Sequence, residues 1–358
     1  MTLTDDVERA RAELVTINDQ PYNAEAPPHA LASDITPTAQ HYVRSNFALP
    51  DHDGTLTVGG AVDHVLSLTL DDLRSMPAVE HAVTLECAGN GRLDTRPLPA
   101  GEPWGGYAVS TAVWTGARLS DVLERAQPHA DGVEVRCTGA DSGTYHLKPV
   151  LPETGDHLTF VRSLDLGRAS DPDSDILVAY DMNGEPLQPD HGSPFRLIVP
   201  GLYAVASVKW LTRLDVVTSP FTGEFQTGHY MYQWPDRPDE PVTDMLVRAR
   251  IVEPAPATVL PAGTHTVRGK AWSGSGPITA VHVSFTGEGE WHEARVEPAV
   301  GPHAWQSWTF EWEADDPGRH SLRARATDAA GNVQPEVPPW NRLGYGNNAV
   351  ELRYVDVV

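Results

Sequence analysis

The sequence predicts an α+β domain followed by an all-β sandwich of the immunoglobulin type. Between residues 41 and 240, short segments that alternate apolar and polar residues are separated by turns and by a few helical patterns. Residues 235–241 are polar and proline-rich, which is typical of a linker between domains. After them the periodic segments all alternate, and none has the length and spacing of a helix.

The chain of 358 residues divides into three predicted parts. Residues 1–40 form an N-terminal helix and arm, residues 41–240 the α+β domain, and residues 241–358 the all-β domain. The helix is expected over residues 5–17, where four apolar residues fall on one side: Val7, Ala10, Leu14 and Ile17. The arm, Pro21–Pro37, carries aromatic and apolar residues among its prolines. We therefore expect it to pack on the body and not to act as a flexible linker.

Residue patterns also predict the elements inside the two domains. In the α+β domain, alternation or short apolar runs predict strands at 56–60, 66–70, 133–138 and 196–199. Helical patterns occur at 70–75 and within 114–126. The second of these helices is expected to begin with Ser120 as its N-cap, and Asn183-Gly184 is typical of a hairpin turn. In the all-β domain, strands are expected at 264–272, 278–285, 308–312 and 320–326.

The charge and cysteine content restrict the possible partners. The formal net charge of −23 argues against nucleic acids and anionic membranes, because both bind basic surfaces. Two cysteines, Cys87 and Cys137, do not make a disulfide framework, and Cys137 is interpreted as a core residue of its strand. The sequence has no export signal and no run of ~18 apolar residues. We therefore expect a cytoplasmic protein, or a periplasmic one if an export signal is missing from the sequence.

The most informative segment is His81–Arg92. Val83, Leu85 and Cys87 fall on one face of a predicted strand, and residues 89–92 follow as a glycine-rich turn that ends in arginine. A thiol at the end of a rigid strand, beside a positive charge, suits a soft metal ion. The same residues are also compatible with a small buried cysteine followed by an ordinary Asn-Gly turn.

The segment Leu-Glu-Cys-Ala-Gly-Asn-Gly-Arg at 85–92 closely resembles the cysteine motif of the sulfite oxidase family of molybdenum enzymes. Residues 41–50, residues 179–211 and the Trp340-Asn341 pair extend the resemblance along the chain. It implies a molybdopterin-binding α+β catalytic domain followed by a dimerisation domain. It also implies molybdenum–molybdopterin as the cofactor and Cys87 as the metal ligand. The sequence has no Cys-x-x-Cys-His haem motif, so the haem-free architecture of bacterial and plant members is expected.

The resemblance implies further residues that bind the cofactor. Besides Cys87, the matching positions are Tyr42, Arg44, Asn46, His191, Arg196, Ser207 and Lys209. Asn46 stands where the family usually has histidine. Arginine and lysine suit the pterin phosphate, because a phosphate dianion needs cations and N–H donors. Asp141, in the loop expected after the 133–138 strand, either contacts the cofactor or is an ordinary turn aspartate.

The catalytic residues implied by the resemblance are Cys87, Arg44, Arg92 and Tyr230. Both arginines would hold a small oxyanion through charge-assisted hydrogen bonds, and the tyrosine would donate a further hydrogen bond to it. Tyr232 is the neighbour that competes with Tyr230 for this assignment.

One position departs from the family pattern. The family commonly has an arginine shortly after the Trp-Asn pair, but Leu343 stands there, and Arg342 comes one residue early. On a strand a shift of one residue reverses the facing of a side chain, whereas in a loop it need not. The pocket is therefore expected to carry one cation fewer.

The implied activity is oxygen-atom transfer that oxidises sulfite to sulfate, with electrons passed to an external acceptor. The acidic surface favours a basic acceptor such as a c-type cytochrome, and the C-terminal domain implies a homodimer. Two alternatives remain open. The first is a reductase or dehydrogenase of another small oxoanion, sulfoxide or sulfur compound, and the second is a binding or assembly protein that has kept the fold without the metal.

Overall fold

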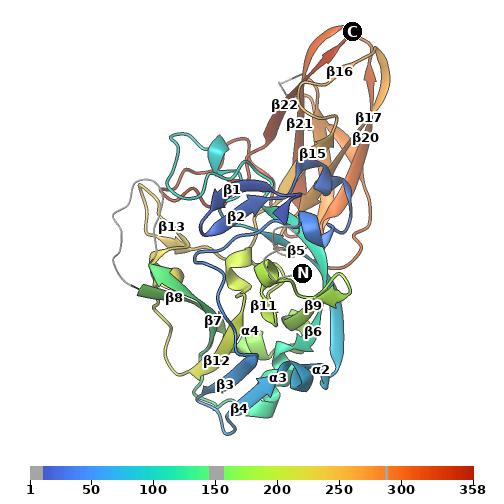
Figure 1. The fold of residues 1–358 in the computed structure, drawn as a ribbon. Coiled ribbons are helices and arrows are strands. Elements are labelled where there is room, and N and C mark those ends of the chain that lie inside the picture. Colours follow the sequence, from blue (N-terminus) through green and yellow to red (C-terminus); the bar gives the residue numbers. More distant parts are fainter. Residues whose placement is uncertain (1–10, 145–156, 287–288) are drawn as a thin grey trace.

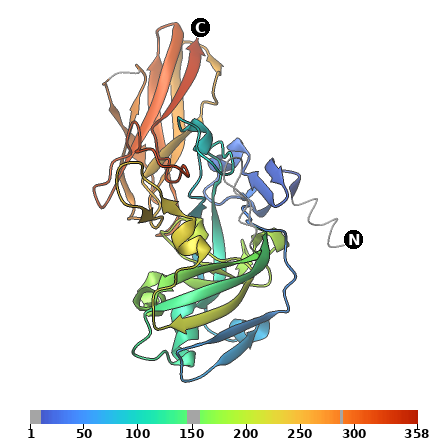
Figure 2. The ribbon, with the colours of Figure 1, turned by 90° about the vertical axis from the view of Figure 1, so that its left-hand side faces the viewer.

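The computed structural model describes residues 11–144, 157–286 and 289–358, drawn in Figures 1 and 2. Residues 5–10 of the predicted N-terminal helix lie outside the described residues. The end of that prediction is wrong, because Val15–Asp19 is strand β1, which pairs antiparallel with β2, Tyr22–Glu25. Val15, Thr16 and Ile17 are consecutive β-branched residues, and such side chains favour a strand over a helix.

The first large sheet of the α+β domain has the order β10-β9-β6-β5, with β11 paired to β9. Its strands are β5 (Ala78–Glu86), β6 (Val109–Arg118), β9 (Leu177–Met182), β10 (Glu185–Pro186) and β11 (Arg196–Ile198). Asn183 and Gly184 have φ of 54° and 80° and close the β9–β10 hairpin. Positive φ at both central residues is the requirement of a type I′ turn, so the hairpin prediction is confirmed.

The second large sheet has the order β4-β3-β12-β7-β8, and β12 runs parallel to β3 and antiparallel to β7. Its strands are β3 (Thr55–Gly60), β4 (Leu66–Thr69), β7 (Glu134–Thr144), β8 (His157–Asp165) and β12 (Leu211–Val217). The fully buried Cys137 lies in β7 and is a core residue as predicted. Asp141 also lies in β7 and not in the loop that was expected there, because this strand continues past an irregularity between Thr138 and Ser142.

The helices are short and join the strands. The α-helices are α2 (Leu70–Arg74), α3 (Leu119–Ala126) and α4 (Leu166–Ser170). The prediction of an N-cap at Ser120 is wrong, because β6 extends to Arg118, which is the N-cap residue of α3. The alternating residues of 114–118 pair with β5 and β9, so sheet pairing decides the conformation of the segment that was assigned to a helical pattern.

Single turns of 3₁₀ or π helix and two minor strands complete the α+β part. They are η1 (Pro28–Ala32), η2 (Thr38–Gln40), η3 (Arg92–Asp94), η4 (Pro172–Ser174), η5 (Pro189–His191), η6 (Ala204–Ala206), η7 (Glu224–Gly228), β13 (Met231–Tyr232) and β14 (Glu240–Pro241).

The C-terminal domain is all-β, as predicted, and lies at the opposite end of the molecule from α2, α3 and β4 (Figure 1). Eight strands follow the hydrogen-bonded order β15-β17-β20-β19-β18-β21-β22-β16. They are β15 (Arg248–Glu253), β16 (Val259–Leu260), β17 (Gly263–Trp272), β18 (Ile278–Ser284), β19 (His292–Val296), β20 (Gln306–Ala314), β21 (Gly318–Asp328) and β22 (Glu351–Val357). One apolar cluster takes residues from both ends of this order, so the two halves of the sheet face each other across a shared core.

Strand β5 of the α+β domain forms hydrogen bonds to the all-β domain. Backbone N–H of Thr84 donates to the carbonyl of His303 over 2.9 Å, and the N–H of Trp305 donates to Oγ1 of Thr84 over 2.8 Å. The C-terminal end of β5 therefore lies against the all-β domain. No helix in the described part of the chain has the length and apolar character needed to span a membrane.

Candidate active site

A cavity with about 670 Å³ of empty space, including the solvent at its open mouth, is lined by residues from both large sheets of the α+β domain. Cys87 follows β5 and Arg196 lies on β11 of the first sheet, whereas Asp141 on β7 and Phe160 on β8 come from the second. The predicted site residues that line this cavity are Tyr42, Arg44, Asn46, Cys87, Asp141, His191, Arg196, Ser207, Lys209 and Tyr230.

Cys87 is carried to the cavity by β5, which pairs with β6 along its whole length. The strand ends at Glu86, and a turn follows in which the N–H of Asn90 donates to the carbonyl of Cys87 over 2.9 Å. Gly91 has φ of 77°, a conformation that costs glycine little. Burial raises the pKa of the Cys87 thiol, and the positive charges of Arg44 and Arg92 partly offset this effect. A bound cation would favour the thiolate at this position.

Arg196 is buried and Lys209 is partly buried, and both side chains donate hydrogen bonds to oxygen atoms. Arg196 donates from Nη1 and Nη2 to the carbonyls of His191 and Ser207, each over 3.0 Å. Lys209 Nζ donates to Ser45 Oγ over 2.9 Å and to the Asp190 carbonyl over 2.8 Å. Burial lowers the pKa of Arg196 to about 10 and, together with the neighbouring Arg196 charge, lowers that of Lys209 to about 7. Within the described residues, neither forms an ion pair with a carboxylate.

His191 stacks edge-on with His41 at a ring-centroid distance of 5.1 Å. Burial lowers the pKa of His191 to about 3, with added repulsion from Lys209 and Arg196, and burial also holds the pKa of His41 well below its usual value. Both imidazoles are therefore neutral at pH 7. His41 Nδ1 lies 3.0 Å from the Tyr42 carbonyl, whereas its Nε2 is buried without a partner in the described protein.

Arg44, Asn46 and Tyr230 form a second group on the cavity wall. Arg44 Nη2 donates to Asn46 Oδ1 over 2.6 Å, and Asn46 Nδ2 lies 3.4 Å from the Tyr230 hydroxyl. Tyr230 stacks on Tyr345 at 5.3 Å and adopts a φ of 59°. Such a conformation is strained for a residue other than glycine, and strain of this kind is concentrated at functional sites. Tyr232 does not line the cavity, because it stacks on Trp234 instead.

Asp141 projects from β7 into the cavity, so the interpretation as an ordinary turn residue is wrong. Its side chain is 4% exposed, and Oδ1 has no hydrogen-bond partner among the described residues. Burial raises the pKa of Asp141 to about 6, against the opposing effect of the Lys209 charge. An unsatisfied buried carboxyl oxygen is costly, so its presence in a cavity indicates that a polar ligand completes it.

Sequence reasoning assigned no role to two residues that contribute to this region. Asp190 lines the cavity and forms an ion pair with Arg11 over 2.7 Å, which links the N-terminal part of the chain to a cavity residue. Arg162 on β8 lies behind Tyr230, with its guanidinium 6.0 Å from the ring centroid. Phe160, Arg162 and Leu164 alternate along the buried face of β8. This pattern could have indicated Arg162, because burying a charge is costly unless it has a structural or functional partner.

Comparison with known proteins decides the family. Residues 46–225 match the family model described as "Oxidoreductase molybdopterin binding domain", and residues 239–353 match "Mo-co oxidoreductase dimerisation domain". Mitochondrial sulfite oxidase of Mus musculus is 33% identical over 97% of this chain and 66% of its own length. The chain belongs to the sulfite oxidase family of molybdopterin-dependent oxidoreductases.

Other members of this family are similar to the chain over nearly its whole length. Nitrate reductase [NADH] 1 of Oryza sativa subsp. japonica is 34% identical over 96% of this chain, which spans 40% of that protein. The sulfane dehydrogenase SoxCD from Paracoccus pantotrophus has a solved structure that superposes with a TM-score of 0.83 at 26% identity. This match covers 99% of this chain and 90% of that one. The chain therefore spans only part of the sulfite oxidase and nitrate reductase relatives.

The cavity fits the molybdenum–molybdopterin cofactor of the sulfite oxidase family. Cys87 supplies a sulfur donor of the soft type that suits this metal. Arg196 and Lys209 supply positive charge for a phosphate, and His41 and Asp141, whose Nε2 and Oδ1 have no partner among the described residues, line the same cavity. These buried polar atoms are expected to find partners on a bound polar group.

Arg92 lies beside this cavity but does not line it. Its Nε donates to the Leu343 carbonyl over 2.9 Å and its Nη1 to the Glu102 carbonyl over 2.6 Å. Its guanidinium also lies 5.4 Å from the Tyr345 ring centroid. Arg92 thus sits close enough to Cys87 to lower the pKa of the thiol, while two of its donor groups are used to hold the protein together.

The departure from the family pattern near the C-terminus is visible in the structure. Leu343 is 1% exposed and packs in the main core, whereas Arg342 is exposed and does not line the cavity. The one-residue shift therefore does not bring Arg342 into the pocket.

Proposed function

We propose that this protein oxidises sulfite to sulfate by molybdenum-dependent oxygen-atom transfer and passes the electrons to an external acceptor. The observation that carries the proposal is a single cavity in which Cys87, the cations Arg44, Arg196 and Lys209, and the hydroxyl of Tyr230 meet. A small anion suits this cavity despite the net charge of −23, because the reach of surface charge is only about 8 Å at physiological salt.

The cofactor would be held by residues of this chain that already point into the cavity. Cys87 is the proposed metal ligand, and His191, Arg196, Ser207 and Lys209 would hold the pterin and its phosphate, with Tyr42, Asn46 and Asp141 on the same wall. When bound, the cofactor supplies the transferable oxygen atom and the two-electron redox chemistry. A phosphate would raise the pKa of Lys209 from about 7, because an adjacent anion favours the charged ammonium.

The substrate would be bound by Arg44 and Tyr230. Arg44 offers charge-assisted hydrogen bonds to an oxyanion, and the Tyr230 hydroxyl offers a neutral donor beside it. Asn46 connects these two side chains and so fixes the spacing of their donors. Arg92, at the end of the turn that follows Cys87, adds positive charge that would favour both the thiolate and an incoming anion.

A second function on the same scaffold is favoured by one observation. Leu343 is buried where the family commonly has an arginine, so the pocket holds less positive charge than the usual family pattern. Less positive charge suits a less charged substrate, such as a sulfoxide or another sulfur compound, and a reductase or dehydrogenase of such a molecule is the alternative. The names of the relatives cover sulfite, nitrate and sulfane, which is the range of substrates to test.

The proposed partners follow from the surface and from the C-terminal domain. The strongly acidic chain would attract a basic redox protein such as a c-type cytochrome through complementary charge. We propose that residues 241–358 form an immunoglobulin-type sandwich that joins two copies of the chain into a homodimer, that residues 41–240 bind the cofactor, and that residues 1–40 pack on the body.

The test is metal analysis coupled to a sulfite-driven reduction of an artificial dye. The proposal predicts about one molybdenum per chain and dye reduction that depends on sulfite. Metal-replete protein that fails with sulfite but turns over a sulfoxide or a sulfane compound would favour the alternative. Metal-free protein after expression with molybdenum and a working cofactor pathway would favour a binding or assembly role and contradict both enzymatic proposals.

A further inference from the structure

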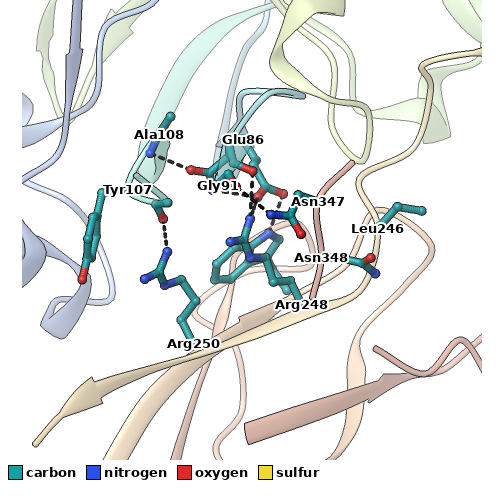
Figure 3. A network of polar contacts seen from close by, with 12 residues as sticks. Glu86, Gly91, Tyr107, Ala108, Leu246, Arg248, Arg250, Asn347 and Asn348 are labelled. Atoms are coloured by element: carbon teal, nitrogen blue, oxygen red, sulfur yellow. Dashed lines mark hydrogen bonds and ion pairs between the residues drawn. The ribbon is translucent and has the colours of Figure 1, made fainter. Parts of the chain in front are cut away.

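Glu86, the residue before Cys87, is a buried carboxylate that is held from the C-terminal domain (Figure 3). Its Oε1 accepts a hydrogen bond from Arg248 Nη1 over 3.0 Å, which is also an ion pair, and its Oε2 accepts one from Trp272 Nε1 over 2.8 Å. Asn90 Nδ2, from the turn after Cys87, donates to the same Oε1 over 2.8 Å. Glu86 is 2% exposed and Arg248 is 5% exposed, so water does not compete for these contacts.

The backbone of the turn after Cys87, residues 88–92, is bound by the C-terminal part of the chain as well. Three of its carbonyl groups accept from that part: Ala88 from Gly346 N–H over 2.8 Å, Asn90 from Arg248 Nη1 over 3.4 Å, and Gly91 from Asn347 Nδ2 over 2.6 Å. In the other direction, Arg92 Nε donates to the Leu343 carbonyl. The turn cannot shift without breaking several buried hydrogen bonds to the other domain.

We infer that Arg248 and Trp272 of the C-terminal domain are positioning residues for the Cys87 sulfur. They hold the Glu86 carboxylate, which precedes Cys87 in the chain, and Glu86 in turn binds Asn90 of the turn that follows Cys87. Residues of the C-terminal domain therefore fix the direction of the thiol. The inference rests on the proposed function, because it concerns the sulfur that is proposed to bind the metal. It adds to the C-terminal domain a role in the cofactor site besides dimerisation.

Charge supports the same role for Arg248. Glu86 places a negative charge one residue from the thiol. Arg248 balances it through the buried ion pair. Without Arg248 the carboxylate would stay buried and unpaired, a costly arrangement that favours movement of the strand end and of the sulfur attached to it.

Arg250 offers a matched control on the same strand. It is also 5% exposed and also crosses to the α+β domain, where its Nη1 donates to the Gly106 carbonyl over 2.5 Å (Figure 3). Its carboxylate partner is Glu351 of its own domain, and among the described residues it makes no hydrogen bond or ion pair with Glu86 or with the turn. Its loss therefore weakens the same domain interface without freeing Glu86.

The test compares Arg248→Met and Arg250→Met in the full chain carrying its cofactor. We expect the amide hydrogens of Asn90 and Arg92 to exchange at least tenfold faster in Arg248→Met than in the wild type and at an unchanged rate in Arg250→Met. We also expect the thiolate-to-metal absorption band to shift in Arg248→Met alone. Equal exchange and identical spectra in Arg248→Met and wild type would overturn the inference, and so would equal changes in the two variants.

Two further arms keep the test decisive. If Arg248→Met does not fold, Trp272→Phe removes one hydrogen bond to Glu86 and keeps an aromatic side chain, and about threefold faster exchange of the same amides is expected. An unchanged rate in that variant would overturn the inference. The exchange measurement needs no metal, so a wild type that binds no molybdenum would contradict the proposed function, while the exchange rates would still decide whether the C-terminal domain holds the turn.

Discussion

Two groups of residues line the cavity and are held in different ways. The cofactor group, His191, Arg196 and Lys209, comes from one compact segment, and its cations donate to backbone carbonyls at positions 190, 191 and 207. The substrate group, Arg44, Asn46 and Tyr230, comes from segments far apart in the sequence. Its members contact one another through side chains, and Arg44 also donates to the backbone carbonyl of Ser45. The first group is therefore built within one segment, whereas the second depends on how the fold brings two segments together.

The largest effect is expected from a substitution in the cofactor group. Lys209→Met removes a partly buried charge and two hydrogen bonds while keeping the length of the side chain. We expect molybdenum content to fall at least tenfold, because the phosphate loses one of the two cations proposed to hold it.

Lys270→Met is the matched control for Lys209→Met. Lys270 is 2% exposed, which is more fully buried than Lys209, and it pairs with Asp34 and Ser307 away from the cavity. The control should keep its metal at the cost of some stability. Equal metal loss in both variants would show that the cofactor group has no special part in binding.

A substitution in the substrate group should leave the metal in place. Arg44→Met removes the charge that faces the cavity, and we expect kcat/KM for sulfite to fall about 100-fold, which is about 3 kcal/mol of lost transition-state binding. Molybdenum content should be unchanged. Steady-state kinetics together with metal analysis measures both quantities, and metal loss in this variant would remove the distinction between the two groups.

The pH dependence of stability tests the burial of His191, a member of the cofactor group. The pKa of His191 is about 3 in the folded protein, whereas that of an exposed histidine in the unfolded chain is about 6.5. Between these two pH values unfolding takes up a proton, so the free energy of unfolding decreases as the pH falls through this range. Between pH 6 and pH 4 this amounts to about 2 kcal/mol. His191→Gln should lose less stability over that interval in the cofactor-free protein, as measured by urea unfolding. Parallel curves for variant and wild type would contradict the assignment.

A smaller loss of activity is expected from Arg162, which packs against Tyr230 but does not line the cavity. Arg162 donates to the backbone of Phe225 in the turn that leads to Tyr230, and its guanidinium lies near the Tyr230 ring. Arg162→Met should lower kcat/KM about fivefold, roughly 1 kcal/mol, by loosening the position of Tyr230. Kinetics with the Arg162→Lys variant check this, because lysine keeps the charge and should recover part of the loss.

The sequence predicted much of the local structure that carries the two groups. Strand alternation and turn residues placed β3, β4, β7, β11 and the Asn183-Gly184 hairpin, since these depend on local chemistry. The resemblance to the family named residues in both groups. What it missed depends on contacts across the fold: the extension of β7 that carries Asp141, the pairing that makes 114–118 a strand, and the buried charge of Arg162. No local pattern encodes the first two, whereas the alternation around Arg162 on β8 was a usable signal.

The same reasoning explains why the position of Leu343 could not be settled from sequence. A shift of one residue reverses the facing of a side chain on a strand but not necessarily in a loop, and the loop character of 341–344 is a result of the fold. The structure leaves Arg342 in solvent and Leu343 in the core. The Arg342→Ala variant should therefore keep the kcat/KM of the wild type.

X-ray absorption at the molybdenum edge, applied to the wild type and to Cys87→Ser, tests whether the sulfur at position 87 is bound to the metal. The proposal predicts one sulfur ligand fewer in the serine variant at equal metal content, since the cavity places this thiol among the cofactor-binding residues. The same number of sulfur ligands in both proteins would contradict it.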